Sequence, residues 1–399
     1  MNDANNKKSL VVLAFAIMAL LGFIMTLKGA LIPSIKSDFN ISYSSVGLMF
    51  LIGDIGYMLA TLLGGIAAEK LGLKRIFYLG FIAAISAIIG INFTNSFLGL
   101  ILFMTMLLTG MGFFEIGLNS LGAKIFTANT AVMMSLLHFF YGVGSSISPK
   151  YAGSLLIRGF SWKKVYLFSL LLIGLIFVFL ILSHFPQNEA TEENGSLSIY
   201  EIASNKKVWI FVASLGLSVV AELGISTWLI NFLQEVHGLD INTSSIYLTL
   251  FYVTFTVGRI LGGFLAEKLG YVNIIIYFIA ITACLISGGL ILGGKWIILF
   301  SFTGFFISIL YPTIMTIITK EFKSNTTSIM GFIIALASGL NMIANLIIGR
   351  TSDNLGVFKG FSSILIYIAL GFISFLLLKR NVTFDKIEGV DAAADVCKA

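Results

Sequence analysis

Twelve long apolar stretches follow one another along this chain, and they constrain its fold more than any other feature. A stretch of about 20 mostly apolar residues can cross a lipid bilayer as a helix. Only 11% of the 399 residues are charged, against roughly 25% in a soluble domain, so the chain lacks a polar shell for a water-soluble core. We therefore predict twelve membrane spans, at residues 10–34, 45–68, 76–92, 97–122, 131–157, 164–184, 208–233, 243–266, 272–292, 296–319, 326–349 and 361–379.

The same composition excludes several classes of function. It is incompatible with a cytosolic enzyme, a nucleic-acid-binding protein or a disordered chain. The net charge of +6 comes from basic residues in short connections, and so it does not indicate a nucleic-acid partner. The two cysteines, Cys284 and Cys397, offer neither a disulfide framework nor metal-ligand spacing. No phosphate-binding loop or nucleophile constellation occurs, so we predict that the protein is not an enzyme. We also predict that it is a monomer with no cofactor and no metal.

One connection is much longer than the others and divides the chain. Residues 185–207 are polar, carry four glutamates and lie near the middle of the sequence. They separate six spans from six. We predict a bundle of six helices at 1–184, a cytoplasmic loop at 185–207, a second bundle at 208–380 and a cytoplasmic tail at 381–399.

An internal repeat supports this division. Residues 64–72 read GGIAAEKLG and residues 262–270 read GGFLAEKLG, which match at seven of nine positions 198 residues apart. Self-similarity at half-length in a membrane chain indicates two related bundles with a site between them near the midplane. The predicted fold is an all-α polytopic membrane protein whose two six-helix bundles are related by pseudo-two-fold symmetry.

The distribution of lysine and arginine predicts the orientation in the membrane. With the N-terminus inside, 15 of the 25 basic residues fall in cytoplasmic segments and seven fall outside, which leaves Lys28, Lys150 and Arg259 within spans. Cytoplasmic loops carry the excess of basic residues. We therefore predict a multi-pass protein of the plasma membrane with both termini in the cytoplasm, and refer below to the predicted inner and outer ends of its helices.

The first copy of the repeat resembles the loop signature of the major facilitator superfamily. In that signature, an acidic residue and basic residues join spans two and three. The second copy keeps the acid, Glu267, but not the basic end of the signature. The resemblance implies the major facilitator fold, and implies that the loop charges and Arg259 act in conformational gating. The first-copy residues that carry it are Gly65, Glu69, Lys70, Gly72, Lys74 and Arg75.

Ionisable residues inside spans are costly and are functional candidates by default. Lys28 and Asp54 lie at similar predicted depths on consecutive helices, so we expect them to interact, either as a substrate- or ion-linked pair or as a structural ion pair. Glu115 and His138 lie level on the fourth and fifth spans, and Asn119 shares the face of Glu115. A carboxylate beside an imidazole is suited to carrying a proton. The predicted proton-coupling residues are Glu115, His138 and Asp54.

The seventh span carries a second polar group. Glu222 belongs to a stripe of residues four apart, and Trp228 and Asn231 lie on a neighbouring face. An indole with amides suits a sugar-like ligand, although Trp228 also fits an aromatic belt residue at the membrane boundary. The predicted substrate-binding residues are Lys28, Asn119, Glu222, Trp228, Asn231 and Asn341.

Several segments resemble the fucose:proton symporter family within the superfamily. The fourth-span pattern at 110–119, the fifth-span pattern at 136–144 and shorter matches at 27–33, 222–228 and 311–313 carry this resemblance. It implies sugar:proton symport with Glu115 as the transport-critical acid. Some members have an aspartate near the position of Gly29, where this chain has none.

These observations predict a secondary active transporter with a small-molecule substrate, protons and the lipid bilayer as its partners. The leading prediction is proton symport of a small polar solute, in the first place a sugar. Two alternatives remain open from the residues. One is proton-coupled efflux of a drug. The other is transport of an organic anion, with Lys28 and Lys150 as counter-charges.

Overall fold

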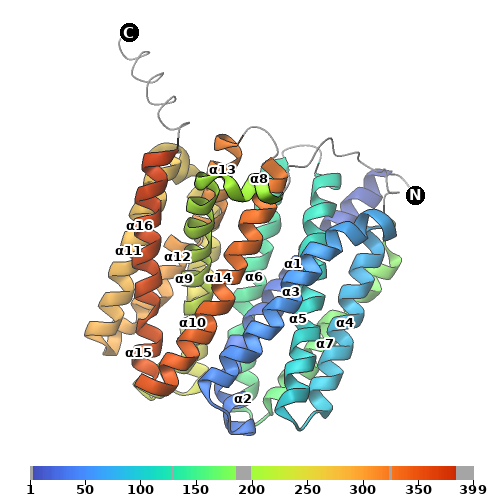
Figure 1. Cartoon of the computed structure of the whole chain (residues 1–399). Coiled ribbons are helices and arrows are strands. Elements are labelled where there is room, and N and C mark those ends of the chain that lie inside the picture. The colour runs from blue at the N-terminus through green and yellow to red at the C-terminus, as the bar shows by residue number, and fades with distance from the viewer. Residues whose placement is uncertain (1–2, 127–129, 186–198, 323–325, 383–399) are drawn as a thin grey trace. The chain divides into compact units, whose positions relative to one another are not determined.

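The computed structural model describes residues 3–126, 130–185, 199–322 and 326–382. Within these ranges the secondary structure is helical (Figure 1). Eleven segments are long and apolar enough to cross a membrane, and α6, whose first side chains lie outside the described part, covers the predicted fifth span. The crossings are α1 (Asp3–Ala30), α3 (Tyr43–Leu71), α4 (Leu73–Phe93), α5 (Phe97–Ile125), α6 (Thr130–Ile157), α7 (Trp162–Leu182), α9 (Lys206–His237), α10 (Ile241–Leu269), α11 (Tyr271–Leu292), η1 with α12 and α13 (Gly294–Ile297, Ile298–Ile307 and Leu310–Glu321), α14 (Thr326–Leu355), and α15 with α16 (Val357–Ser362 and Ile364–Asn381).

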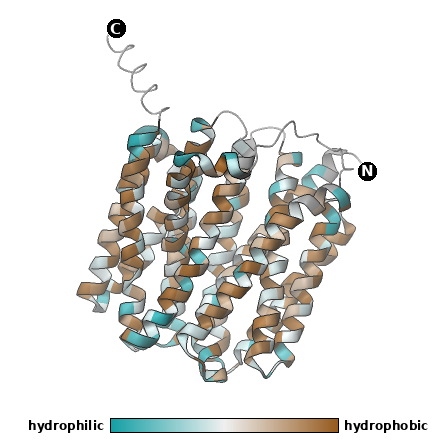
Figure 2. Cartoon of the chain, viewed as in Figure 1, coloured by the Kyte–Doolittle hydropathy of each residue, from teal (hydrophilic) through white to brown (hydrophobic). Residues whose placement is uncertain are grey.

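Hydropathy follows the helices as the sequence predicts. Hydrophobic residues occupy most of each long helix, and hydrophilic residues gather at the helix ends and turns (Figure 2). Many large apolar side chains are exposed on the outer faces of these helices, among them Leu98, Leu171 and Phe264. An exposed apolar surface of that extent is typical of a protein whose helices contact lipid.

The predicted boundaries need three corrections. The first span does not run through to residue 34: it ends at Ala30, and a separate helix α2 (Ile32–Phe39) starts with Pro33 in its first turn. The tenth span breaks after Ile307, because Pro312 has no N–H to give to the preceding turn. The predicted loop 185–207 contains a short helix, α8 (Ile199–Ser204), while residues 186–198 lie outside the described part.

Both copies of the repeat end their helices in the same way. Gly72 follows α3 with φ 89° and begins α4, and Gly270 follows α10 with φ 81° and begins α11. Only glycine adopts these positive φ values without strain. The equivalence of the two segments is therefore confirmed at the level of local backbone geometry.

The structure divides into two compact units. Unit 1 contains Met1–Thr191, Ser226–Val253 and Asn345–Phe361, and unit 2 contains Glu192–Ile225, Thr254–Ala344 and Ser362–Ala399. In unit 1, α1 packs on α6, and α5 packs on both α3 and α4. In unit 2, α11 packs on α12, α13 and α16. Each unit is described by itself below.

Candidate functional site

The ion pair between Lys28 and Asp54 is present in unit 1. Lys28, in the last turn of α1, places its Nζ 3.2 Å from Oδ1 of Asp54 on α3. The side chains are only 8% and 10% exposed, and the ammonium also lies 5.2 Å from the centre of the Phe50 ring. The predicted contact is thus confirmed, while its role in transport stays a prediction.

Asp54 belongs to one stripe of α3 that continues to the predicted outer end of the helix. Tyr43, Gly47, Phe50 and Asp54 are separated by four, three and four residues, which places them on one helix face. Tyr43 is the first residue of α3 and is buried. The stripe therefore connects the ion pair with the contacts at the outer end.

Tyr43 anchors a network of side chains from α9 and α14. Its hydroxyl donates to a carboxylate oxygen of Glu235 at 2.9 Å, and its ring meets that of Trp228 edge-on at 6.1 Å. Trp228 is 2% exposed, and its indole N–H donates to Oδ1 of Asn345 at 3.0 Å. Burial among helices is not the environment of an aromatic belt residue, so the boundary interpretation of Trp228 is wrong.

Asn231 lies one turn from Trp228 and is fully buried. Its amide faces the Tyr43 hydroxyl, but neither of its side-chain polar atoms reaches hydrogen-bond geometry with a described residue. A buried amide without a hydrogen bond is costly. This position is therefore one at which a polar ligand or water molecule would be stabilised.

Asp353 closes the same end of unit 1. It lies in the last turn of α14, and its carboxylate accepts hydrogen bonds from the backbone N–H groups of Tyr43 at 2.8 Å and Ser44 at 2.7 Å, and from the Ser44 hydroxyl. An acid at a helix N-terminus satisfies orphan N–H groups and complements the helix dipole. Here the helix and its cap are about 310 residues apart in the chain.

Two glycines of unit 1 let backbones meet beside this network. A Cβ at Gly29 would lie 2.9 Å from Cα of Thr227, and one at Gly47 would lie 2.9 Å from Cα of Leu346. Any larger residue there would push α1 from α9, or α3 from α14. With the hydrogen bonds around Tyr43, these contacts close the predicted outer end of unit 1.

The predicted proton site lies elsewhere in unit 1. Glu115, on α5, is half-buried, and its carboxylate accepts a hydrogen bond from the amide of Asn119 at 3.3 Å. The shared face of these two residues is thus confirmed. His138 is half-buried on α6. Its pairing with Glu115 stays a prediction.

Unit 2 holds the remaining intramembrane candidates. Glu222 is buried halfway along α9 and interacts electrostatically with Arg259 of α10, whose guanidinium lies 4.6 Å from the centre of the Phe255 ring. Asn341 is buried on α14. Arg259 therefore provides the counter-charge for Glu222, in addition to its predicted role in gating.

The signature loop lies in unit 1 at the predicted inner end. Lys74 donates to the carbonyl oxygens of Ile181 at 3.0 Å and Ser183 at 2.8 Å, so it caps the C-terminus of α7. A shallow cavity of about 360 Å³ is lined here by Leu71, Gly72, Leu73, Lys74, Arg75, Tyr78 and Phe185. Lys70 and Arg75 are exposed, Gly65 is half-buried, and the Glu69 side chain lies outside the described part. In unit 2, Glu267 is exposed.

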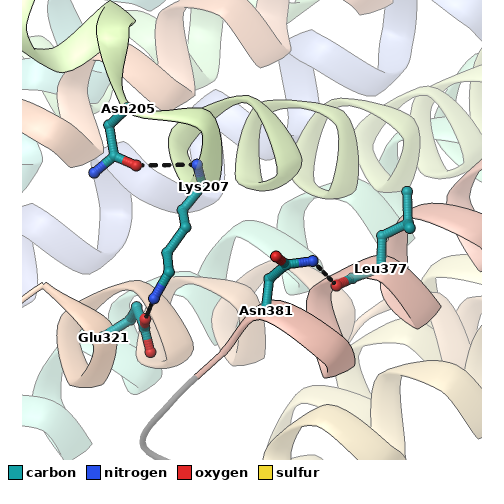
Figure 3. Close-up of polar contacts among 5 residues, drawn as sticks. All are labelled: Asn205, Lys207, Glu321, Leu377 and Asn381. Atoms are coloured by element: carbon teal, nitrogen blue, oxygen red, sulfur yellow. Dashed lines mark hydrogen bonds and ion pairs between the residues drawn. The ribbon is translucent and has the colours of Figure 1, made fainter.

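An ion pair at the predicted inner end of unit 2 was not predicted from the sequence. Lys207, in the first turn of α9, forms an ion pair with the buried carboxylate of Glu321 at the end of α13 (Figure 3). The backbone N–H of Lys207 also donates to Asn205 at 3.0 Å, and the Asn381 amide donates to the carbonyl of Leu377 at 2.8 Å. These contacts fix the ends of helices within the unit.

Comparison with known proteins decides the family. The family model of the Major Facilitator Superfamily matches residues 13–333. The chain belongs to this superfamily. Membership of this superfamily makes the protein a membrane transporter rather than an enzyme.

Two curated relatives are similar over much of the chain. A "Protein TsgA homolog" of Buchnera aphidicola subsp. Schizaphis graminum is 23% identical over 393 residues, covering 94% of this chain and 97% of the relative. A "Cis,cis-muconate transport protein" of Acinetobacter baylyi is 25% identical over 274 residues, covering 64% of this chain and 66% of the relative.

Solved transporters share the fold of this superfamily member. A bacterial homologue of the lysosomal transporter Spinster has a TM-score of 0.77 at 15% identity, covering 94% of this chain and 97% of its own. A D-xylose-proton symporter has 0.77 at 14%, covering 95% and 98%. The E. coli fucose:proton symporter has 0.65 at 19%, covering 92% and 98%. The predicted twelve-helix major facilitator fold is therefore confirmed.

Proposed function

We propose that this transporter moves a small polar solute, in the first place a sugar, across the plasma membrane by proton symport with alternating access. We further propose that it acts as a monomer with both termini in the cytoplasm. The bundles 1–184 and 208–380 are its moving parts, joined by the loop 185–207.

The observation that carries the proposal is that a buried indole lies on the same helix as one buried amide and is hydrogen-bonded to another. Trp228, Asn231 and Asn345 are all buried, and the Asn231 amide has no hydrogen bond to a described residue. Burying an indole N–H or an amide costs free energy that an apolar side chain of similar size would not cost, so we infer that these side chains do more than fill space. A sugar offers an apolar ring face to an indole and hydroxyl groups to amides. The likeness in fold to xylose and fucose symporters agrees with this choice but does not carry it.

Proton coupling is assigned to Glu115, with His138 and Asp54 as further candidates. An ionisable side chain inside a membrane span is a candidate for carrying a proton. The Asn119 amide donates to the Glu115 carboxylate, so the unloaded, charged form also has a partner. Glu115 is therefore suited to alternate between a protonated and a charged form during the cycle.

Alternating access requires an end that closes and reopens. The contacts of Tyr43 with Glu235 and Asp353, and the Gly29 and Gly47 crossings, close unit 1 at the predicted outer end. The signature residues Gly65, Glu69, Lys70, Gly72, Lys74 and Arg75, with Arg259 and Glu267, are the proposed counterpart at the inner end.

Transport of an organic anion is a second candidate. One relative is named for transport of muconate, a carboxylate, and Lys28 is a buried cation in unit 1. Lys150 is a weaker counter-charge, because it is exposed and donates to Asn242 at 2.6 Å.

A solute screen in proteoliposomes with an imposed pH gradient tests the proposal. Accumulation of a solute together with acidification of the lumen is the expected result. Accumulation without proton movement would contradict symport, and extrusion driven by the gradient would show efflux instead. Neutral sugars and organic anions in the same screen separate the two candidate substrates.

A further inference from the structure

We propose that Lys28 is the binding site for an anionic group of the solute, that this group displaces Asp54, and that Asp54 takes up a proton as it is displaced. The substrate class is then a small polyhydroxy carboxylate, that is, a sugar acid. The inference rests on the proposed function, which it narrows from a polar solute to one that carries a carboxylate.

The first observation is that the ion pair is incomplete. A lysine ammonium has three N–H donors and a carboxylate has two acceptor oxygens. Among the described residues, the ammonium of Lys28 has one hydrogen-bond acceptor, Oδ1 of Asp54, at the long distance of 3.2 Å. Oδ2 of Asp54 is buried without a partner. A structural ion pair repays its desolvation only when its remaining donors and acceptors are satisfied.

The second observation is that no other described ionisable side chain forms a hydrogen bond or an ion pair with Lys28 or Asp54. Lys28 contacts Phe50 and Asp54 on α3. On the α5 side, the groups that meet α3 at Gly53 and Gly56 are Leu108, Met104, Thr105 and Thr109, none of which titrates near neutral pH. The charges of Lys28 and Asp54 therefore compensate only each other. When an anion binds to Lys28 in place of Asp54, a proton must neutralise the Asp54 carboxylate.

The third observation places the pair beside the proposed sugar-binding residues. Asp54 is eleven residues from Tyr43 on the α3 stripe, or roughly 16 Å along the helix. Gly47, between them, packs on the backbone of α14 at Asn345. Gly29, next to Lys28, packs on Thr227, next to Trp228. The helices that carry Lys28 and Asp54 therefore pack directly on those that carry Trp228 and Asn345.

The charge balance of the step follows directly. Before binding, Lys28 and Asp54 carry +1 and −1. With solute bound, Lys28 and the carboxylate carry the same two charges, and Asp54 is neutral because one proton has come from the solvent. No uncompensated charge is buried in either state. The proton on Asp54 is additional to the one that Glu115 is proposed to carry.

The other basic residues within the predicted spans fit this role less well. Arg259 in unit 2 already has Glu222 as its counter-charge and Phe255 against its guanidinium. Lys150 is exposed and bonded to Asn242. Among the described residues, the Lys28 pair alone combines burial with an unsatisfied carboxylate oxygen.

Binding to the purified full-length protein in nanodiscs tests the proposal with matched probes. Gluconate is compared with glucose, and galacturonate with galactose, by calorimetry in two buffers of different ionisation enthalpy. We expect each acid to bind at least about tenfold tighter than its neutral partner, as a charge-assisted hydrogen bond in a buried site gives. We also expect each acid to take up about one proton more on binding than its neutral partner does.

Variants then assign the effect to the pair. Lys28→Gln with Asp54→Asn keeps a neutral hydrogen-bonding pair and should lose the preference for the acids, so that each acid and its neutral partner bind this variant with similar affinity. Asp54→Asn alone should bind the acids without the additional proton uptake. Lys150→Gln, an exposed lysine of the same unit, is the matched control and should change neither result. Glu115→Gln should leave the proton count at Asp54 unchanged.

Three results would overturn the inference: equal affinity of the wild type for acid and neutral sugar, retention of the acid preference in the double variant, or no additional proton uptake by the wild type with the acids. The first needs no variant, so a double variant that fails to fold leaves the test intact. If neutral sugars accumulate under a pH gradient but acids do not bind, the proposed function stands and this inference fails. If acids bind with proton uptake but no solute accumulates, this inference stands and the proposed function fails.

Discussion

Buried side chains of single residues carry the proposed chemistry of this transporter. Trp228 and Asn341 are both more than nine-tenths buried, in helices whose other buried residues are mostly apolar. A polar group in such a place either stabilises the fold through its hydrogen bonds or binds a ligand, and the two roles respond differently to substitution.

Truncation of the proposed sugar-binding residues tests the second role. Trp228→Ala or Asn341→Ala removes a ring face or an amide, each worth about 1.4 kcal/mol to a bound solute, so we expect the KM of the folded protein to rise about tenfold. Initial rates of transport in proteoliposomes measure this. An unchanged KM in both variants would show that the site lies elsewhere.

Substitution of the proposed coupling acid separates binding from coupling. Glu115→Gln mimics the protonated carboxyl group, so the variant should still bind solute and exchange it in counterflow. It should not accumulate a neutral sugar under a pH gradient, because residue 115 can then neither take up nor release a proton, and Asp54 is proposed to take one up only when an acid binds. If it still concentrates solute when only a pH gradient is supplied, Glu115 is not the coupling acid, and Asp54 becomes the leading candidate.

A double-mutant cycle measures the energy of the Lys28 and Asp54 pair. Lys28→Ala leaves a buried carboxylate without its counter-charge, which costs about 3–5 kcal/mol unless the carboxylate takes up a proton. The double change to neutral residues should therefore destabilise the protein less than the sum of the single changes. Thermal unfolding in detergent at neutral pH supplies the three free-energy differences. Strict additivity would argue against an energetic coupling of the two residues.

At the scale of helices, the cap of α3 by Asp353 joins two segments that are about 310 residues apart in the chain. Asp240 offers a comparison at the same predicted end, because it caps its own helix α10 through the N–H groups of Asn242 at 2.8 Å and Thr243 at 3.1 Å. The Thr243 hydroxyl and backbone N–H lower the pKa of Asp240, which keeps its carboxylate charged at neutral pH. One acid thus stabilises a helix locally, and the other joins distant segments.

Removal of each cap distinguishes these two effects. Asp353→Ala should open the predicted outer end, and a lost cap of about 1 kcal/mol corresponds to about a fivefold larger open population. The reporter is a cysteine at Thr227, which is buried against Gly29, in a chain with Cys284→Ser and Cys397→Ser. An impermeant maleimide should label it about fivefold faster. Asp240→Ala, the control, should lower stability by a similar amount without faster labelling; equal labelling of both variants would contradict the gating role of Asp353.

For the whole molecule, orientation is the expectation that most affects the mechanism. Fifteen basic residues on one side against seven on the other predict that both termini face the cytoplasm. Reporter fusions that are active only inside or only outside the cell, placed at each terminus and after Phe93, should give cytoplasmic signals at both termini and an external signal after α4. An external signal at either terminus would reverse the assignment of the inner and outer ends.

Much of the fold could be predicted from the sequence because membrane spans are coded locally. Hydrophobic length identified the crossings, and the GGxxAEKLG repeat identified two equivalent helix ends, which Gly72 and Gly270 form with nearly the same backbone angles. The break after Ala30 and the helix α8 were missed, because hydropathy averages over about 20 residues and does not resolve a single turn.

For the candidate site, the sequence by itself determined which residues are costly to bury. Burying a charged side chain inside an apolar span costs free energy, and this singles out Lys28, Asp54, Glu115 and Glu222. Equal depth on consecutive helices was enough to predict the Lys28 contact with Asp54. Trp228 could be assigned to a buried site or to the membrane boundary, and local sequence does not separate the two.

Only the tertiary structure decided where these residues find their partners. The bonds of Tyr43 to Glu235 and Asp353 join residues 192 and about 310 positions apart, and Trp228 finds Asn345 across 117. No periodicity encodes such pairs, because the face that a helix turns to a distant neighbour depends on how every intervening helix packs. Charge and hydropathy are properties of a residue and its window, whereas a hydrogen bond is a property of two positions brought together by the whole chain.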